Sequence, residues 1–363
     1  MRLDIDMWLF IVLTQLLAMV SSAMLWWLIR PKSAFSKIAL IASVFIINNI
    51  ALFYGLSDYW RERFHIYLVI SILQGFMVYA LLITGAIAFI YNKVLRQPYK
   101  PKLIRLLSLM VFIGIVSLAL FNAYSPVVKR LTVTVDKPLD QPIKMILLSD
   151  THIGQWFGSR QLDKLVNLVD KQNPDVVLIA GDVMNDTTYY YDKSNMHEQL
   201  SKLQAPLGVY AVLGNHDYSG NEVAIAKAVQ RAGIEVIDNK TVLLDEAVWL
   251  VGRSDETDIG RPLAADLLAQ VDSKKPVIVL EHSPSEIEFI SELPFDLHLA
   301  GHTHGGQIFP LTYLLKWFKP LVHGHKRIDG SQFLVTSGYG FGAVPFRLGT
   351  RSEVWAITLE SGL

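Results

Sequence analysis

The chain contains no cysteine among its 363 residues. Disulfide bonds, thiolate catalysis and cysteine-ligated zinc sites are therefore excluded. Charged residues are also scarce, at 18%, whereas hydrophobic residues make up 52%. Basic and acidic residues balance at 33 each. The sequence thus lacks the basic excess that nucleic-acid-binding proteins carry, and we expect no nucleic acid partner.

The scarcity of charge is concentrated in the first third of the chain, which contains long apolar runs. Four of these runs have roughly the 18–25 residues that are needed to cross a bilayer, and they lie near residues 7–29, 38–56, 66–91 and 106–124. Tryptophan and tyrosine gather near the ends of the runs, as they do at membrane interfaces. The sequence therefore predicts a transmembrane domain of about four helices over residues 1–124, with a lipid bilayer as its partner.

A few polar side chains interrupt the apolar runs, namely Thr14, Gln15, Asn48, Asn49 and Gln74. Either a transport path or hydrogen bonding between helices would explain them. Because no charged residue lies inside any run, we favour hydrogen bonding between helices. A transporter or sensor with a regulatory soluble domain remains an alternative to an enzyme.

A different pattern begins at Ser125, where short apolar runs start to alternate with amphipathic stretches, as in α/β domains. Strands are expected at residues 129–136, 143–148, 176–180, 209–213, 248–251, 277–280, 297–300, 333–336 and 354–359. Helices are expected at residues 159–171 and 222–232. We assign residues 125–363 to this second domain.

Five of the expected strands end in side chains that suit metal binding, and seven candidate ligands follow them: Asp150, His152, Asp182, Asn215, His282, His302 and His304. Since the carboxyl ends of strands in open α/β sheets form the edge where sites are built, we expect these side chains to cluster. Imidazole and carboxylate groups bind zinc, manganese or iron. Seven ligands exceed one tetrahedral site, so the sequence predicts two divalent ions. Two ions about 3.5–4 Å apart can clamp a phosphate and activate a bridging water.

The motifs D-x-H, G-D, G-N-H-D, H and G-H-x-H occur here in the order of the calcineurin-like metallophosphoesterase family, which the chain resembles. The extension Gly305-Gly306-Gln307 and residues 338–347 are similar to its bacterial YkuE-like branch, some members of which carry membrane helices ahead of the enzyme domain. The resemblance covers about residues 130–360. It implies a four-layer α/β/β/α sandwich and hydrolysis of a phosphomonoester, phosphodiester or pyrophosphate.

The resemblance also divides the candidate ligands into two groups that share one carboxylate. The first metal, manganese, iron or zinc, would be held by Asp150, His152 and His304. The second would be held by Asn215, His282 and His302. Asp182 would bridge both ions.

Four further residues are given roles in the reaction. By resemblance, His216 would donate a proton to the leaving oxygen or stabilise the transition state, and Asp217 would orient His216. Arg347 is a candidate for contact with the substrate phosphate, with a salt bridge as the alternative. His323 is a candidate lining residue of the substrate pocket, with a place in a polar loop as the alternative.

The segment Ile308–Val322, directly after the last metal motif, combines large apolar side chains with Lys316 and Lys319. This composition suits a membrane interface with anionic headgroups, although a core helix or a packed hairpin is an alternative. An interfacial segment beside the metal motif would favour a phosphorylated lipid as substrate.

The basic residues near the ends of the apolar runs indicate which side faces the cytoplasm. Eight lie after the first run and around the loop after the third: Arg30, Lys32, Lys37, Lys93, Arg96, Lys100, Lys102 and Arg105. Five lie on the opposite side: Arg2, Arg61, Arg63, Lys129 and Arg130. We therefore expect the catalytic domain outside the cell membrane, with a lipid or envelope phosphate as substrate. A cytoplasmic domain would instead favour a nucleotide-sugar lipid pyrophosphatase.

Overall fold

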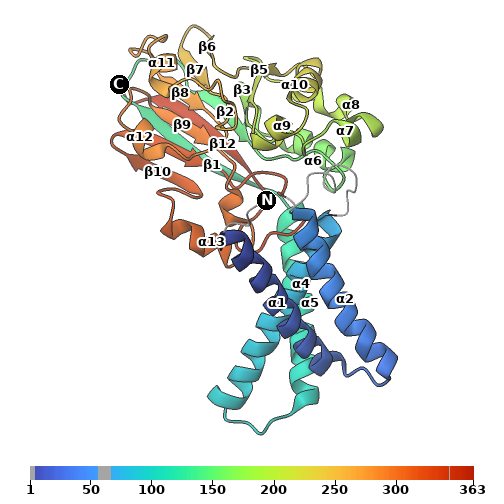
Figure 1. The fold of residues 1–363 in the computed structure, drawn as a ribbon. Helices are drawn as coiled ribbons and strands as arrows, with labels where there is room; N and C mark the ends of the chain where they lie inside the picture. Colours follow the sequence, from blue (N-terminus) through green and yellow to red (C-terminus); the bar gives the residue numbers. More distant parts are fainter. Residues whose placement is uncertain (1–4, 56–66, 343) are drawn as a thin grey trace. The chain divides into compact units, whose positions relative to one another are not determined.

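The computed structural model describes residues 5–55, 67–342 and 344–363 (Figure 1). The chain divides into two compact units, Met1–Ser117 and Leu118–Leu363. The boundary between these units lies inside the last apolar helix. The sequence pattern had indicated a boundary after that helix. The reason is that the end of this helix bonds to the second unit, where the backbone N–H of Ser352 donates to the carbonyl of Asn122 at 3.0 Å.

The first unit contains long apolar helices at all four predicted runs: α1 (Ile5–Ile29), α2 (Ala34–Gly55), α4 (Tyr67–Phe89), extended by η1 (Ile90–Val94), and the start of α5 (Pro101–Tyr124). Among the described residues, two segments, Ile72–Val94 and Pro101–Tyr124, are long and apolar enough to cross a membrane. The apolar parts Thr14–Ile29 and Ala34–Ile50 are shorter. The prediction of about four spans is therefore supported for two. Arg2, Arg61, Arg63 and the ends of two predicted spans, residues 56 and 66, lie outside the described residues.

The polar side chains within the helical unit pair with one another across helices. Gln15 Nε2 donates to Asn49 Oδ1 at 2.8 Å, and Gln74 Nε2 donates to Asn48 Oδ1 at 3.3 Å. These bonds satisfy groups that would otherwise be costly in an apolar environment. The predicted hydrogen bonding between helices is confirmed for these pairs.

The second unit is built on two six-stranded sheets (Figure 1). The first runs in the order β1 (Val127–Val135), β12 (Glu353–Ser361), β2 (Ile143–Leu148), β3 (Val176–Ala180), β4 (Val209–Val212) and β5 (Glu235–Val236). The second runs in the order β10 (Gly324–Ile328), β11 (Ser331–Val335), β9 (Leu297–Ala300), β8 (Val277–Leu280), β7 (Val248–Gly252) and β6 (Lys240–Leu244). Strands β2, β3 and β4 are parallel to one another, as are β7, β8 and β9.

Alternation of side chains along the strands produces the layers. Leu147 of β2 lies in the core between the two sheets together with Leu280 of β8. The next residue, Leu148, points to the opposite face and packs with Leu162 of α6. Helices α6 (Ser159–Asp170) and α10 (Glu222–Arg231) cover the first sheet, and α11 (Ala264–Leu268) and α12 (Ile287–Ile290) cover the second. The mixed α/β architecture with two sheets is confirmed, and its layers run helices, sheet, sheet, helices.

The remaining short helices lie in connections between strands. They are α7 (Tyr189–Lys193), α8 (His197–Leu200), α9 (Asn215–Ser219), η2 (His304–Gly306), α13 (Leu311–Leu314) and η3 (Leu315–Trp317). Two of these helices begin at predicted metal ligands, since α9 starts at Asn215 and η2 at His304.

Candidate metal centre

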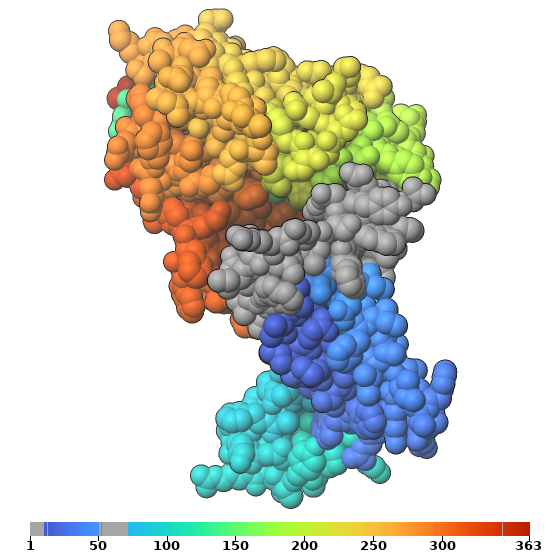
Figure 2. Space-filling view, in the orientation of Figure 1, coloured from blue at the N-terminus to red at the C-terminus, as the bar shows by residue number. Residues whose placement is uncertain are grey.

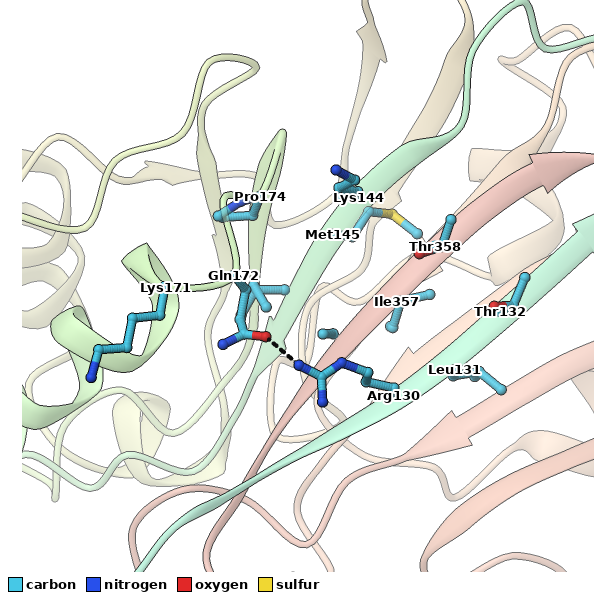
Figure 3. Close-up of a pocket in the computed structure, with 12 residues that line it drawn as sticks. Arg130, Leu131, Thr132, Lys144, Met145, Lys171, Gln172, Pro174, Ile357 and Thr358 are labelled. Atoms are coloured by element: carbon cyan, nitrogen blue, oxygen red, sulfur yellow. Dashed lines mark hydrogen bonds between the residues drawn. The ribbon is translucent and has the colours of Figure 1, made fainter.

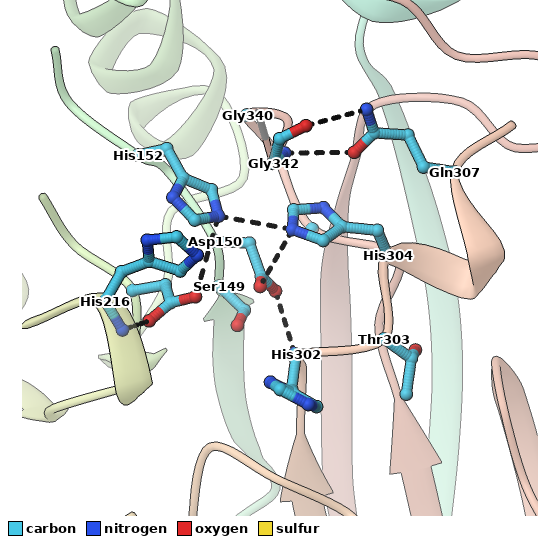
Figure 4. A network of polar contacts seen from close by, with 12 residues as sticks. Ser149, Asp150, His152, His216, His302, Thr303, His304, Gln307, Gly340 and Gly342 are labelled. Atoms are coloured by element: carbon cyan, nitrogen blue, oxygen red, sulfur yellow. Dashed lines mark hydrogen bonds and ion pairs between the residues drawn. The ribbon is translucent and has the colours of Figure 1, made fainter. Parts of the chain in front are cut away.

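The predicted ligands come from the carboxyl ends of strands in both sheets, and Figure 4 shows four of them close together, namely Asp150, His152, His302 and His304. The ends of β2, β3 and β4 carry those of the first sheet, and the ends of β8 and β9 carry those of the second. A buried contact joins the two edges, because His282 Nδ1 donates to the carbonyl of Ala180 at the end of β3, at 2.8 Å. This bond leaves His282 Nε2 free to face the other ligands.

The first group of ligands is packed around the ring nitrogens of two histidines (Figure 4). His152 Nε2 lies 3.2 Å from His304 Nε2. Asp150 Oδ1 lies 3.5 Å from His304 Nε2, and Asp182 Oδ2 lies 3.6 Å from His152 Nε2. These atoms point toward one another from three different loops, as the ligands of one metal ion would.

The second group converges on an amide oxygen. Asn215 Oδ1 lies 2.9 Å from His302 Nδ1 and 3.1 Å from His282 Nε2. Asp182 Oδ2 lies 3.2 Å from His282 Nε2. The same oxygen of Asp182 therefore faces both groups, which is the position of a shared ligand.

The donor atoms fit divalent cations. Asp150 Oδ1 is buried and has no hydrogen-bond donor among the described residues. Burial lowers the pKa of His152 to about 4 and that of His304 well below its usual value, so their rings stay neutral and keep a lone pair for a metal. Burial would also lower the pKa of His282, but the charge of Asp182 raises it to about 10. The surroundings thus favour positive charge between Asp182 and His282.

The backbone is strained at the same positions. Five predicted ligands have positive φ angles, between 45° and 67°: Asp150, His152, Asp182, His302 and His304. Residues with side chains rarely adopt this conformation, and it persists where the surrounding structure enforces it. Gly214 and Gly301 leave the space that this packing needs, since a Cβ on either would collide with the carboxylate of Asp182 or Asp150. The folded domain therefore preorganises the ligands.

His216 stands beside the first group, but its orienting partner differs from the predicted one. Its Nδ1 lies 2.7 Å from Asp186 Oδ1, and its backbone N–H donates to Asp182 Oδ1 at 2.9 Å. Asp217 is fully buried and accepts instead from the backbone N–H groups of Val183, Met184 and Gly214. The prediction that Asp217 orients His216 is corrected: Asp217 holds two strand-end loops together, and Asp186 orients the histidine.

Asp186 was missed because it belongs to none of the motifs. The signal was a carboxylate four residues after Asp182, in the same loop after β3. Burial would lower the pKa of His216, but the hydrogen bond to Asp186 and the charge of Asp182 raise it to about 9. These two carboxylates therefore favour the protonated form of His216, the form that can donate a proton.

Arg347 does not lie as a phosphate-reaching side chain would. It is fully buried, and its guanidinium donates to the carbonyls of Ser337 and Gly340, each at 2.6 Å. Its Nη2 also lies 3.3 Å from His304 Nδ1. Gly340 in turn donates to the carbonyl of Asp150 at 2.8 Å. A buried guanidinium needs several hydrogen-bond acceptors, and Arg347 finds them in the glycine-rich loop. Arg347 thus holds this loop against the predicted ligands His304 and Asp150.

His323 is likewise engaged, in its case with a buried carboxylate. Its Nε2 lies 3.0 Å from Glu353 Oε1, and Lys129 Nζ lies 2.8 Å from Glu353 Oε2. Burial would raise the pKa of Glu353, but His323 and Lys129 lower it well below its usual range. His323 thus contacts a buried carboxylate, and its place in the substrate pocket stays a prediction.

A separate hollow of about 420 Å³ lies on the outer face of the first sheet, beside the end of α6 (Figure 3). Its basic residues Arg130, Lys144 and Lys171 are exposed, and Arg130 Nη2 donates to Gln172 Oε1 at 3.1 Å. No predicted metal ligand lines this hollow. The clustered ligands, and not this hollow, are the candidate active site.

Comparison with known proteins identifies the family of this chain. The model of the calcineurin-like phosphoesterase family matches residues 143–306. An uncharacterized metallophosphoesterase of Campylobacter jejuni is 30% identical over 319 residues, which cover 84% of this chain and 83% of that protein. The chain belongs to the calcineurin-like metallophosphoesterases. It is a metal-dependent phosphoesterase.

Two further relatives are a YkuE protein and a protein named as transmembrane. The metallophosphoesterase YkuE of Bacillus subtilis is 27% identical, over 60% of this chain and 79% of that protein. A transmembrane protein with metallophosphoesterase domain from Danio rerio is 31% identical, over 60% of this chain. This chain spans about half, 53%, of the length of that relative. The name of the Danio rerio relative describes that protein as transmembrane, and the described part of this chain has two helices long and apolar enough to cross a membrane.

Proposed function

We propose that this metallophosphoesterase is a multi-pass membrane protein that hydrolyses a phosphate ester or pyrophosphate of a lipid or cell-envelope substrate on the outer side of the membrane. Two divalent ions, manganese, iron or zinc, when bound, would activate a water molecule and neutralise the phosphate oxygens. The single observation that carries the proposal is the pair of ligand groups that share Asp182 Oδ2, at 3.6 Å from His152 and 3.2 Å from His282.

The chain's own residues would supply the rest of the chemistry. The ring of His216, held by Asp186, is suited to donate a proton to the leaving oxygen. Arg347 and the glycine-rich loop would keep His304 and Asp150 in their strained conformations while the substrate changes. No covalent intermediate is required, because a water molecule can act as the nucleophile.

The proposed activity predicts metal-dependent hydrolysis of a simple soluble substrate. The purified full chain should hydrolyse an aryl phosphodiester, lose this activity after treatment with a chelator, and regain it with Mn²⁺, Fe²⁺ or Zn²⁺. The reason is that the predicted ligand side chains lie close together in the folded domain, so the apo protein should rebind metal without refolding. The release of the coloured phenol is measured. A preparation that stays inactive with each metal, while folded by circular dichroism, would count against the enzyme.

The proposed side of the membrane predicts the behaviour of fusions after Leu363. A reporter that is active only outside the cytoplasm should be active there, and one that is active only inside should be silent. The basis is the excess of basic residues in the loops after the first and third runs. Fusions after Lys100, in a loop expected inside, should give the opposite pattern and serve as the control. If the C-terminal fusion reports the cytoplasm, a nucleotide-sugar lipid pyrophosphatase becomes the better proposal.

A further inference from the structure

The aromatic segment, residues 309–318, is an exposed apolar surface directly after the metal-ligand motif. It comprises α13, η3 and their flanking residues, and it forms part of the orange-red lobe that projects from the second unit in Figure 2. Its large exposed side chains are Phe309, Leu311, Tyr313, Leu314, Trp317 and Phe318. Trp317 and Phe318 are 77% and 78% exposed. The exposure of these side chains excludes the alternative of a core helix, whereas that of a packed hairpin is not tested by it. Exposed apolar side chains that gather in one short segment mark a candidate interaction site.

The charge on this surface is positive, which favours an anionic partner. Between Ile308 and Val322 the charged residues are Lys316 and Lys319, and no acidic residue occurs. Lys316 Nζ lies 5.3 Å from the centre of the Tyr313 ring. Aromatic residues beside lysines match the interface of a bilayer, where rings lie at the level of the headgroups and ammonium groups pair with anionic phosphates.

The aromatic segment is hydrogen-bonded to residues 347–348, which in turn bond to the last turns of α5. Its Phe309 N–H donates to the carbonyl of Leu348 at 2.7 Å. The neighbouring Arg347 N–H donates to the carbonyl of Ala119 in α5 at 3.0 Å. All of these residues belong to the second unit, Leu118–Leu363. The aromatic segment is therefore connected through two hydrogen bonds to the last turns of the helix Pro101–Tyr124. This helix is long and apolar enough to cross a membrane.

The same turn connects the segment to the metal ligands. His304 opens η2, and Gln307 at its end donates through Nε2 to the carbonyl of Gly342 at 3.0 Å (Figure 4). Gly306, with a φ of 80°, packs so closely on the start of α13 that a Cβ would collide with Leu311 and Thr312. The turn that holds His304 is therefore packed directly against the start of the aromatic segment.

From these contacts we propose that the aromatic segment docks in the interface of an anionic bilayer and so presents the metal centre to the phosphate of a lipid headgroup. This inference deepens the proposed function and rests on it for the substrate. Burying Trp317 and Phe318 in the interface would contribute favourable free energy through their apolar surface. Lys316 and Lys319 would make the docking depend on anionic lipid.

The absence of cysteine allows docking to be measured without reference to activity. The Trp317→Cys variant of the full chain is labelled at its single cysteine with an environment-sensitive dye. It is then reconstituted in bilayers of phosphatidylcholine and phosphatidylglycerol that contain nitroxide-labelled lipids as quenchers. The dye should be quenched several-fold more than the same dye at Val223→Cys, an exposed position on α10. Removing phosphatidylglycerol, or adding Lys316→Gln with Lys319→Gln, should weaken quenching. Equal quenching at both positions would overturn the inference.

Whether the segment presents a lipid phosphate to the metal centre is tested by the ratio of two turnover rates, one on a bilayer phospholipid and one on a soluble aryl phosphodiester. Trp317→Ala with Phe318→Ala should lower the turnover of a bilayer phospholipid at least about 10-fold more than that of a soluble aryl phosphodiester. Val223→Ala with Phe289→Ala, two exposed apolar residues on other helices, should leave the ratio near that of the wild type. An unchanged ratio in the aromatic variant would overturn presentation. Failure of the wild type on the soluble diester would instead contradict the proposed function, whatever the quenching shows.

Discussion

Replacing Asp182 with alanine is expected to abolish metal binding and hydrolysis together. Its Oδ2 faces both ligand groups, and its Oδ1 accepts the backbone N–H of His216 at 2.9 Å. Loss of both ions removes several kcal/mol of charge stabilisation, so the turnover should fall roughly 10³-fold or more. Metal content by mass spectrometry and turnover of an aryl phosphodiester are measured on the same preparation.

The matched control is Asp170→Ala, which removes an exposed carboxylate at the end of α6. This variant should keep its metal and its turnover within about twofold, since surface substitutions rarely change a folded domain. Circular dichroism on both variants separates loss of metal from loss of fold. If Asp182→Ala retained two ions with near-normal turnover, the shared position of this carboxylate would have no functional meaning.

Replacing His216 with alanine is expected to leave both metals bound but to lower turnover by roughly 10²–10⁴-fold, the usual contribution of a positioned proton donor. His216 contacts the metal ligands through its backbone and the edge of its ring, while its Nδ1 is held by Asp186. Metal content should therefore match the wild type. Near-normal turnover in His216→Ala would contradict the assigned role.

Two aspartate variants then separate orientation of His216 from support of the fold. Asp186→Asn keeps an oxygen acceptor for His216 but removes the charge, so turnover should fall about 10-fold with the melting temperature unchanged. Asp217→Asn disturbs a buried carboxylate that accepts three backbone N–H groups, so it should lower the melting temperature first. Reversed effects in the two variants would restore Asp217 as the orienting residue.

Much of the site could be predicted because its signals are local. Strands β2, β3, β8 and β9 have the bounds that the apolar runs indicated, and polar groups follow each of them directly. Within each sheet the parallel strands bring such groups to one edge, so the sequence alone predicts clusters of metal-binding side chains. The short strands β5, β6 and β10 were not predicted, since their runs are too short or too polar to stand out.

Contacts between distant segments were beyond the sequence pattern. Asp186 and Asp217 are both carboxylates near His216, and only the path of the loop after β3 decides that the first reaches its ring. Arg347 follows a glycine-rich stretch in a manner typical of an anion-binding loop, yet it is buried under that loop. The boundary between the units fell inside α5 because backbone groups of residues 347–352 bond to the helix end.

The sequence by itself determined the α/β class, the apolar helices and the residue types that can bind two metals, because hydrophobic periodicity and strand-end chemistry are properties of neighbouring residues. Tertiary structure decided which ligand atoms face each other, since the ligands of β2, β3 and β4 meet those of β8 and β9 only after the two sheets pack through Leu147 and Leu280. It also decided that the aromatic segment is exposed and bonded near the end of α5. Such placements depend on packing between segments far apart in the chain, which no local pattern encodes.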